Sequence, residues 1–250
     1  MAIPFPKRKV TRAVAAEELA ILARTYPNAV TALQYANPFQ LLIAVILSAQ
    51  NTDARVNLTT PILFAKYPDA YALAKADPAD VEQIIKSCGF FRQKTKSIIS
   101  ASQHLVAEHG GEVPGDRESL EALRGVGRKT ANVVMSVVFE EAAFAVDTHV
   151  FRVSHRLGLT LAVTPRGVED DVTKLVPREK WRHAHHWLIL HGREICKAPV
   201  PHCGRCPVTM CPSRPLVARY LAMKAALKTA SGPARPGARA AAAARPPRPS

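Results

Sequence analysis

The chain has 250 residues, with 34 lysine and arginine side chains against 20 acidic ones and a formal net charge of +14. This length can bury a sizeable core in one domain or two, and a hydrophobic content of 48% is normal for a folded soluble protein. No apolar run reaches the ~18–20 residues of a membrane span, and the basic N-terminus lacks the apolar stretch of a secretion signal. We therefore expect no membrane partner and a cytoplasmic, nucleoid-associated location in a bacterium.

The positive charge is concentrated at the two ends of the chain. Residues 212–250 carry eight lysine or arginine side chains and no acidic one, and four more basic side chains lie within residues 7–12. The remaining body, 13–211, has 22 basic against 20 acidic side chains. Such ends favour a polyanionic partner through salt-sensitive contacts with phosphate groups, but they supply neither chemistry nor the choice of a base.

Apolar residues recur with helical spacing along almost the whole chain. The expected helices cover residues 13–25, 38–50, 54–66, 78–86, 93–109, 117–123, 128–139, 148–158, 167–175 and 179–192. A last helix at 216–227 fits the pattern, whereas residues 231–250 have almost nothing apolar to bury and are predicted to be disordered. There are no alternating strand pairs joined by hairpin turns. The sequence therefore predicts an all-α fold.

Two glycines, Gly125 and Gly127, separate two of these helices in the segment Leu-Arg-Gly-Val-Gly-Arg-Lys at 123–129. Glycine permits positive φ and brings backbone N–H groups close to an anion, and the following helix N-terminus favours phosphate. A plain helix–helix turn is the alternative interpretation. Lys129 falls in the first turn of the second helix, where the dipole disfavours the ammonium form and makes a nucleophilic amine more accessible; a solvated or phosphate-bound lysine is the alternative.

Asp147 follows the apolar run Phe-Ala-Val at 144–146 and precedes Thr-His at 148–149. An acid at this position can cap the helix that follows. Paired with Lys129, it can instead stabilise positive charge that develops on a sugar ring, or activate a nucleophile.

Four of the five cysteines follow the spacing C-x6-C-x2-C-x4-C, at Cys196, Cys203, Cys206 and Cys211. Four thiolates can hold either a tetrahedral zinc ion or a [4Fe–4S] cluster, and the spacing alone does not choose between them. Cys88 stands apart and is expected to be a small buried apolar residue. Four histidines between 183 and 191 have spacings that can bind zinc, but their helix offers them ordinary core and surface positions.

Residues 120–133 and 146–153 resemble the helix–hairpin–helix DNA glycosylases of the endonuclease III family. Further matches are Leu-Ser-Ala-Gln-Asn-Thr-Asp at 47–53 and His-His-Trp-Leu-Ile-Leu-His-Gly-Arg at 185–193. The resemblance covers roughly residues 15–212 and implies two helical domains with DNA in the cleft between them. The implied boundaries are a six-helix barrel domain at 31–141, a cluster domain made of 1–30 and 142–215, and a basic, largely disordered tail of proline, alanine and arginine at 216–250.

The resemblance also implies a bifunctional DNA glycosylase and AP lyase of base excision repair that removes oxidised pyrimidines such as thymine glycol. Lys129 would attack C1′ and form a Schiff base, followed by β-elimination on the 3′ side, and Asp147 would assist departure of the base. The expected partner is double-stranded DNA with damaged bases or abasic sites, bound by a monomer. The four cysteines would hold a [4Fe–4S] cluster.

Contacts with DNA are implied for the glutamine that fills the gap left by the extruded nucleotide, for a phenylalanine wedge on the opposite side, for the hairpin and for one histidine. These residues are Gln50, Phe90 or Phe91, Gly125, Val126, Gly127, Arg128, Thr130 and His149.

Three positions depart from the family pattern. The last cysteine gap has four residues where the family has five, Arg124 replaces a proline, and the loop at 197–202 carries one firm positive charge. Three other functions stay open: an adenine-mismatch glycosylase, which normally lacks the hairpin lysine and has an extra domain; an 8-oxoguanine lyase, which lacks the cysteines; and a non-catalytic iron–sulfur protein that binds DNA and senses redox state. The last would not need a nucleophilic amine at Lys129.

Overall fold

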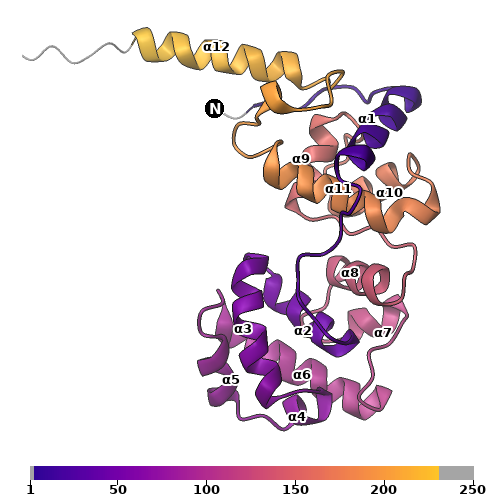
Figure 1. The fold of residues 1–250 in the computed structure, drawn as a ribbon, viewed down its shortest axis with the longest axis vertical. Coiled ribbons are helices and arrows are strands. Elements are labelled where there is room, and N and C mark those ends of the chain that lie inside the picture. Colours follow the sequence, from indigo (N-terminus) through magenta and orange to yellow (C-terminus); the bar gives the residue numbers. More distant parts are fainter. Residues whose placement is uncertain (1–2, 231–250) are drawn as a thin grey trace, which may run out of the picture.

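The helices form two bundles that are stacked along the long axis of the molecule (Figure 1). The computed structural model describes residues 3–230, and every regular element in that range is helical, which confirms the predicted all-α fold. The lower, α2–α8 bundle contains α2 (Pro38–Ser48), α3 (Asp53–Lys66), α4 (Ala70–Ala74), α5 (Pro78–Ile85), α6 (Phe91–His109), α7 (Arg117–Ala122) and α8 (Arg128–Val138). The upper, α1/α9–α12 bundle contains α1 (Arg12–Thr25), α9 (Thr148–Arg156), α10 (Pro165–Thr173), α11 (Trp181–Glu194) and α12 (Arg214–Ala230), with 3-10 turns at Arg178–Lys180 and Cys203–Arg205.

Each bundle has its own hydrophobic core. The core of the α2–α8 bundle is built around α2, which contacts α3, α6 and α8 and buries every residue from 41 to 47. This helix begins where Asn37 accepts a hydrogen bond from the Gln40 N–H at 2.9 Å and Pro38 takes the first helical position. A helix that is apolar on all sides must lie inside other helices, so the sequence of α2 dictates its central place.

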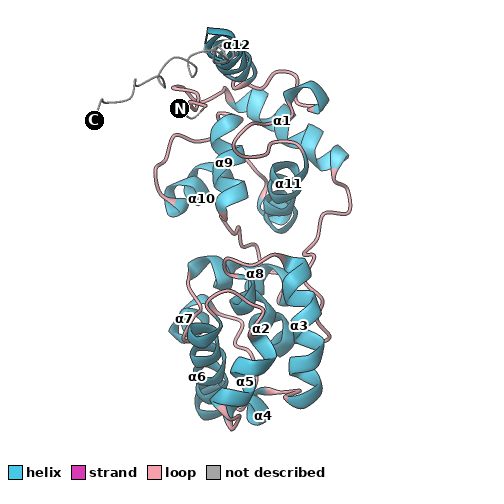
Figure 2. Ribbon diagram, turned by 90° about the vertical axis from the view of Figure 1, so that its left-hand side faces the viewer, coloured by secondary structure: helices cyan, strands magenta, loops and turns pink. Residues whose placement is uncertain are grey.

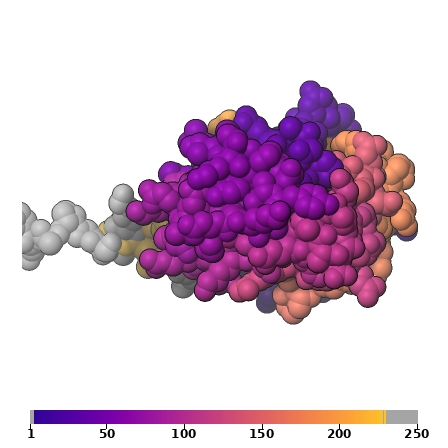
Figure 3. Space-filling view, turned by 90° about the horizontal axis from the view of Figure 1, so that it is seen from below, coloured from indigo at the N-terminus to yellow at the C-terminus, as the bar shows by residue number. Residues whose placement is uncertain are grey.

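The second core joins α1 to helices that come more than a hundred residues later. Leu19 and Leu22 of α1 pack with Val150, Val153 and Leu188 of α9 and α11. Two chain segments connect the bundles (Figure 2). Seen from below, the end of the molecule consists mostly of residues of the α2–α8 bundle, and the other bundle shows only at its margin (Figure 3).

The observed helices follow the predicted ones closely, with one omission and one extension. The five-residue helix α4 was not expected, because it is too short to show a helical period. It begins at Asp69, whose carboxylate accepts a hydrogen bond from the Ala72 N–H at 2.8 Å. Helix α12 extends beyond the predicted 216–227 and leaves the upper bundle on the side away from α8 (Figure 1). The predicted disorder at 231–250 lies outside the described residues. No helix within residues 3–230 is long and apolar enough to cross a membrane.

Glu18 is an unusual member of the second core. Its side chain is fully buried on α1, and neither carboxyl oxygen has a hydrogen-bond partner within the described residues. Burial raises the pKa of Glu18 from 4.5 to about 8. Between those two values the folded protein holds a proton that the unfolded chain releases. The free energy of unfolding therefore falls as the pH rises from 4.5 to about 8. The stability that the protonated Glu18 provides is fully present only below pH 4.5.

We expect Glu18→Leu to raise the thermal midpoint at pH 8 and to flatten its decline between pH 5 and pH 8. In the wild type, the raised pKa of Glu18 lowers the free energy of unfolding at pH 8, relative to acidic pH, by an amount on the order of 4 kcal/mol. Glu17→Leu, an exposed neighbour on the same helix, is the matched control and should leave the pH profile unchanged. Thermal melts at a series of pH values measure both variants. Parallel profiles for wild type and Glu18→Leu would contradict the prediction.

Candidate active site

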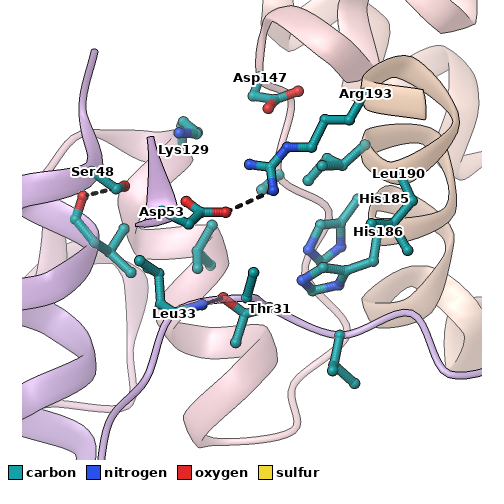
Figure 4. Close-up of a pocket in the computed structure, with 16 residues that line it drawn as sticks. Thr31, Leu33, Ser48, Asp53, Lys129, Asp147, His185, His186, Leu190 and Arg193 are labelled. Atoms are coloured by element: carbon teal, nitrogen blue, oxygen red, sulfur yellow. Dashed lines mark hydrogen bonds and ion pairs between the residues drawn. The ribbon is translucent and has the colours of Figure 1, made fainter. Parts of the chain in front are cut away.

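Two adjoining cavities lie between the bundles, and together we call them the cleft. The larger has a volume of about 550 Å³ and the smaller about 70 Å³. Lys129 and Asp147 line both, as do Ser48, Asp53 and Arg193. Figure 4 shows Lys129 and Asp147 bordering one opening, on different segments of the chain. The structure thus brings together the two residues that the sequence nominated as catalytic.

Lys129 owes its position to the glycine hairpin. Gly125 has φ +86°, and a Cβ there would lie 2.8 Å from the Cβ of Ser97, so only glycine fits. A Cβ at Gly127 would meet no atom within 4 Å, which leaves open space beside the N-terminus of α8. That N-terminus has no side-chain cap, and the Lys129 side chain is exposed in its first turn. The hairpin therefore offers uncapped N–H groups and an exposed amine on the same side.

Two predicted hairpin contacts are already engaged within the protein. The Val126 side chain is buried in the first core, and its N–H donates to the Leu123 carbonyl at 3.0 Å. Val126 therefore shapes the hairpin, with its side chain and its amide both used within the protein. Arg128 donates from Nε and Nη2 to the two carboxylate oxygens of Glu169, both at 2.8 Å. This bidentate ion pair joins α8 to α10 and so links the two bundles. Thr130, in contrast, stays partly exposed at the start of α8.

Asp147 lies at the end of a buried segment and begins α9. Its carboxylate accepts a hydrogen bond from the Val150 N–H at 2.8 Å, which confirms the helix-cap interpretation. The cap uses one oxygen, and the side chain also faces the cleft. Capping and a catalytic role are therefore compatible here.

Asn132 connects the helix of Lys129 to the segment that leads to Asp147, and its role was not found from the sequence. It is buried on α8, one turn after Lys129. Its Nδ2 donates to the Phe144 carbonyl at 2.8 Å, in the segment that leads to Asp147, and its Oδ1 accepts from Arg117. A polar residue on the buried face of an amphipathic helix was the only available signal.

An ion pair crosses the cleft between α11 and α3. Arg193 Nη1 lies 2.6 Å from the Asp53 carboxylate, and Figure 4 shows this contact between the walls. His185 and His186 border the smaller cavity. Each places Nδ1 against a carbonyl of its own helix, at 3.2 Å and 2.9 Å, so Nδ1 carries the hydrogen and Nε2 is an acceptor. Burial lowers the pKa of both imidazoles, which keeps them neutral.

His149 borders the larger cavity in the first turn of α9. Burial lowers its pKa, opposed by Asp147 and reinforced by Arg152 and Arg193. Arg152 Nη2 donates to its Nδ1 at 3.2 Å, which leaves the hydrogen of the neutral ring on Nε2. A neutral imidazole that donates is suited to contact a phosphate or a sugar oxygen.

Gln50 and Phe90 are exposed at the ends of two helices of the α2–α8 bundle. Both have φ +57°, a left-handed conformation that costs a non-glycine residue roughly 1–2 kcal/mol. The Phe90 side chain is 67% exposed, whereas Phe91 packs against the first core. Of the two candidate wedges, Phe90 is therefore the more accessible to a ligand.

The four cysteines Cys196, Cys203, Cys206 and Cys211 line one small pocket of the upper bundle, and none forms a disulfide. The shortened last gap still brings the final cysteine into this pocket, with Val208 buried between. Two arginines hold the cysteine backbone. Arg156 donates to the Cys196 carbonyl at 3.2 Å, and Arg214 donates to the carbonyls of Cys203 and Cys206 at 2.5 Å and 3.0 Å.

No three histidine, cysteine or acidic side chains within residues 3–230 are gathered closely enough to hold a single metal ion. His191, one of the candidate zinc histidines, instead lies 3.3 Å from the Tyr26 hydroxyl and 3.6 Å from Cys206 Sγ. Cys88 is buried, as predicted.

Known proteins match this chain over most of its length. Residues 43–178 match the family described as HhH-GPD superfamily base excision DNA repair protein. Endonuclease III of Synechocystis sp. is 50% identical over 201 residues, covering 80% of this chain and 92% of that protein. Endonuclease III of Escherichia coli is 44% identical over 194 residues, covering 76% and 92%.

Solved structures agree with the sequence relatives. A non-covalent endonuclease III–DNA complex has a TM-score of 0.81 at 42% identity and covers 85% of this chain and 99% of its own. A trapped endonuclease III–DNA covalent intermediate has a TM-score of 0.79 at 44% identity, covering 82% and 97%. With the hairpin, the cleft and the cysteine pocket in place, the chain belongs to the HhH-GPD superfamily and, within it, to the endonuclease III family of DNA glycosylases.

Proposed function

We propose that this protein is a bifunctional DNA glycosylase and AP lyase that removes oxidised pyrimidines such as thymine glycol from double-stranded DNA and acts as a monomer. The observation that carries the proposal is the shared position of Lys129 and Asp147 in one cleft, with an exposed amine at a hairpin suited to phosphate. A target base must leave the stack to reach such a cleft. The covalent intermediate trapped for a related endonuclease III supports a covalent path.

In the proposed reaction the amine of Lys129 attacks C1′, the glycosidic bond breaks, and the base leaves with a proton. Asp147 stabilises the positive charge on the sugar as that bond breaks. The C1′–O4′ bond then opens to give the Schiff base. Loss of a C2′ proton expels the 3′ phosphate and nicks the strand, and hydrolysis releases Lys129.

The lining of the smaller cavity favours a base with hydroxyl groups. Asp53, Arg193 and the acceptor nitrogen of His186 provide polar partners there. Thymine glycol has hydroxyl groups that normal pyrimidines lack, which favours it as the base that enters the cleft.

The test is single-turnover base release and strand cleavage on duplexes with one defined lesion. We expect cleavage at thymine glycol and at abasic sites, and little at an adenine mismatch or at 8-oxoguanine. Preference for either of the last two would replace the proposed lesion class. Tight binding without any cleavage would favour the non-catalytic DNA-binding function.

We also propose that Cys196, Cys203, Cys206 and Cys211 hold a [4Fe–4S] cluster. Four free thiols that line one pocket, fixed by arginines at the backbone, fit this donor set. Iron–thiolate bonds would cross-link the loops on either side of Cys203 and order the upper bundle. The division into a barrel domain at 31–141 and a cluster domain from 1–30 and 142–215 belongs to the same proposal, and the two separate cores support it.

Cys206→Ser should lose most of the bound iron and sulfide and the brown visible absorption of the purified protein. Cys88→Ala is the matched control, since Cys88 is buried in the other bundle, and it should retain both. Elemental analysis for iron, sulfide and zinc decides the question. Stoichiometric zinc without iron in the wild type would refute the cluster.

A further inference from the structure

The loops that carry Gln50 and Phe90 have the same unusual backbone conformation. Each residue has φ +57°, stands next to a helix end and exposes its side chain. Gln50 follows α2, and Phe90 precedes α6. An L-residue stays in the left-handed region only where neighbouring contacts hold it there. Those contacts connect the two loops to each other.

Asn51 makes the first connection. Its Oδ1 accepts a hydrogen bond from the Gly89 N–H at 2.9 Å, and its Nδ2 donates to the Leu47 carbonyl at 2.7 Å. The residue after Gln50 thereby holds the residue before Phe90.

Lys94 makes the second connection from the opposite direction. Its backbone N–H donates to the Phe90 carbonyl at 3.0 Å. Its side chain, only 6% exposed, donates from Nζ to the carbonyls of Leu47 and Ala49 at 2.7 Å and 2.6 Å. A buried ammonium that uses its hydrogens on the Leu47 carbonyl, in the last turn of α2, and on the Ala49 carbonyl just after that helix fixes the chain directly before Gln50.

We propose that Asn51 and Lys94 are positioning residues that hold Gln50 and Phe90 as one rigid unit, so that both side chains enter the DNA duplex together. The inference rests on the proposed function, in which Gln50 fills the gap and Phe90 is the wedge. Fixing both side chains before binding removes the ordering cost of two independent loops. The unit matters only where two strands have to be separated around the target.

The test compares two substrates that differ in this requirement. Asn51→Ala is assayed under single-turnover conditions on a duplex with an abasic site and on a single-stranded oligonucleotide with the same site. We expect the ratio of the duplex rate to the single-strand rate to fall by about ten- to hundredfold. An equal fall on both substrates, or no fall on either, would overturn the proposal.

Asn57→Ala is the matched control. Asn57 also bridges backbone groups of another segment, accepting from the Gln34 N–H at 3.0 Å and donating to the Ala32 carbonyl at 2.8 Å. It should leave the rate ratio of the two substrates unchanged. A similar fall in the ratio for Asn57→Ala would mean that any loosened loop has this effect, and would overturn the specific role of Asn51.

A binding measurement separates this proposal from the proposed chemistry. 2-Aminopurine beside an abasic-site analogue reports unstacking by its fluorescence, and no bond needs to break. Gln50→Ala and Phe90→Ala should each reduce this signal. Their effects should be non-additive in the wild type and additive in Asn51→Ala. Additive effects in both backgrounds would overturn the coupling, even if the enzyme cleaves as proposed. Absence of cleavage with this coupling intact would refute only the reaction.

Discussion

Lys129→Gln is expected to abolish both strand cleavage and the covalent protein–DNA product that sodium cyanoborohydride traps on a thymine glycol duplex. Glutamine is one bond shorter than lysine and has no nucleophilic amine, so neither the bond to C1′ nor the Schiff base can form. Lesion binding should be largely retained, since the hairpin backbone, Phe90 and His149 are untouched. The side chain is exposed and glutamine is as good a helix former as lysine, so stability should change by less than about 0.5 kcal/mol.

Lys75→Gln is the matched control, because Lys75 is an exposed lysine next to the end of α4 and lines neither cavity of the cleft. It should be trapped as efficiently as the wild type. A trapped band that persists in Lys129→Gln would assign the nucleophile to another residue. Loss of lesion binding in parallel with trapping would reduce Lys129 to a DNA contact.

Asp147→Asn is expected to slow base release by about 10²–10⁴-fold while leaving the fold unchanged. Asparagine caps a helix as well as aspartate does, so the hydrogen bond to the Val150 N–H at 2.8 Å is kept. The variant removes only the negative charge from the cleft. Asp147→Ala removes charge and cap together and should lose about 1 kcal/mol of stability as well. Single-turnover base release and thermal melts separate the two contributions.

Asp69→Asn is the control for the cap alone. Asp69 begins α4 with the same geometry, accepting from Ala72 at 2.8 Å, but lies outside the cleft. It should change neither base release nor lesion binding. If Asp147→Asn also keeps full activity, the only role of Asp147 is to begin α9.

What the sequence could predict depends on how local each signal is. Helix starts were predictable because Asn37 and Asp147 meet their N–H partners three residues away. Lys129 and Asp147 could be chosen as the candidate catalytic residues because a hairpin and a helix cap have short spacings. Their common cleft was implied only by the family resemblance, since residues 129 and 147 belong to different segments.

The contacts that sequence reasoning missed join residues far apart in the chain. The pair Arg193–Asp53 spans 140 residues, and Lys94 reaches carbonyls 45 and 47 residues earlier. No periodicity reports such partners, because each residue has an ordinary type in an ordinary helix. Arg128 shows the same limit. Its place in the hairpin predicted a contact with DNA, whereas its observed partner, Glu169, lies on α10.

The Arg128–Glu169 pair has a consequence for the ionic-strength dependence of DNA binding. An arginine that neutralises a phosphate normally displaces cations condensed on the DNA, and each such contact steepens the dependence of affinity on salt. Arg128 arrives with its charge already balanced by a carboxylate at 2.8 Å. If it shares its guanidinium with a phosphate, the net charge brought to the backbone is near zero, and few cations are freed. A count of phosphate contacts from a salt titration would then fall short of the number of residues that contact the backbone.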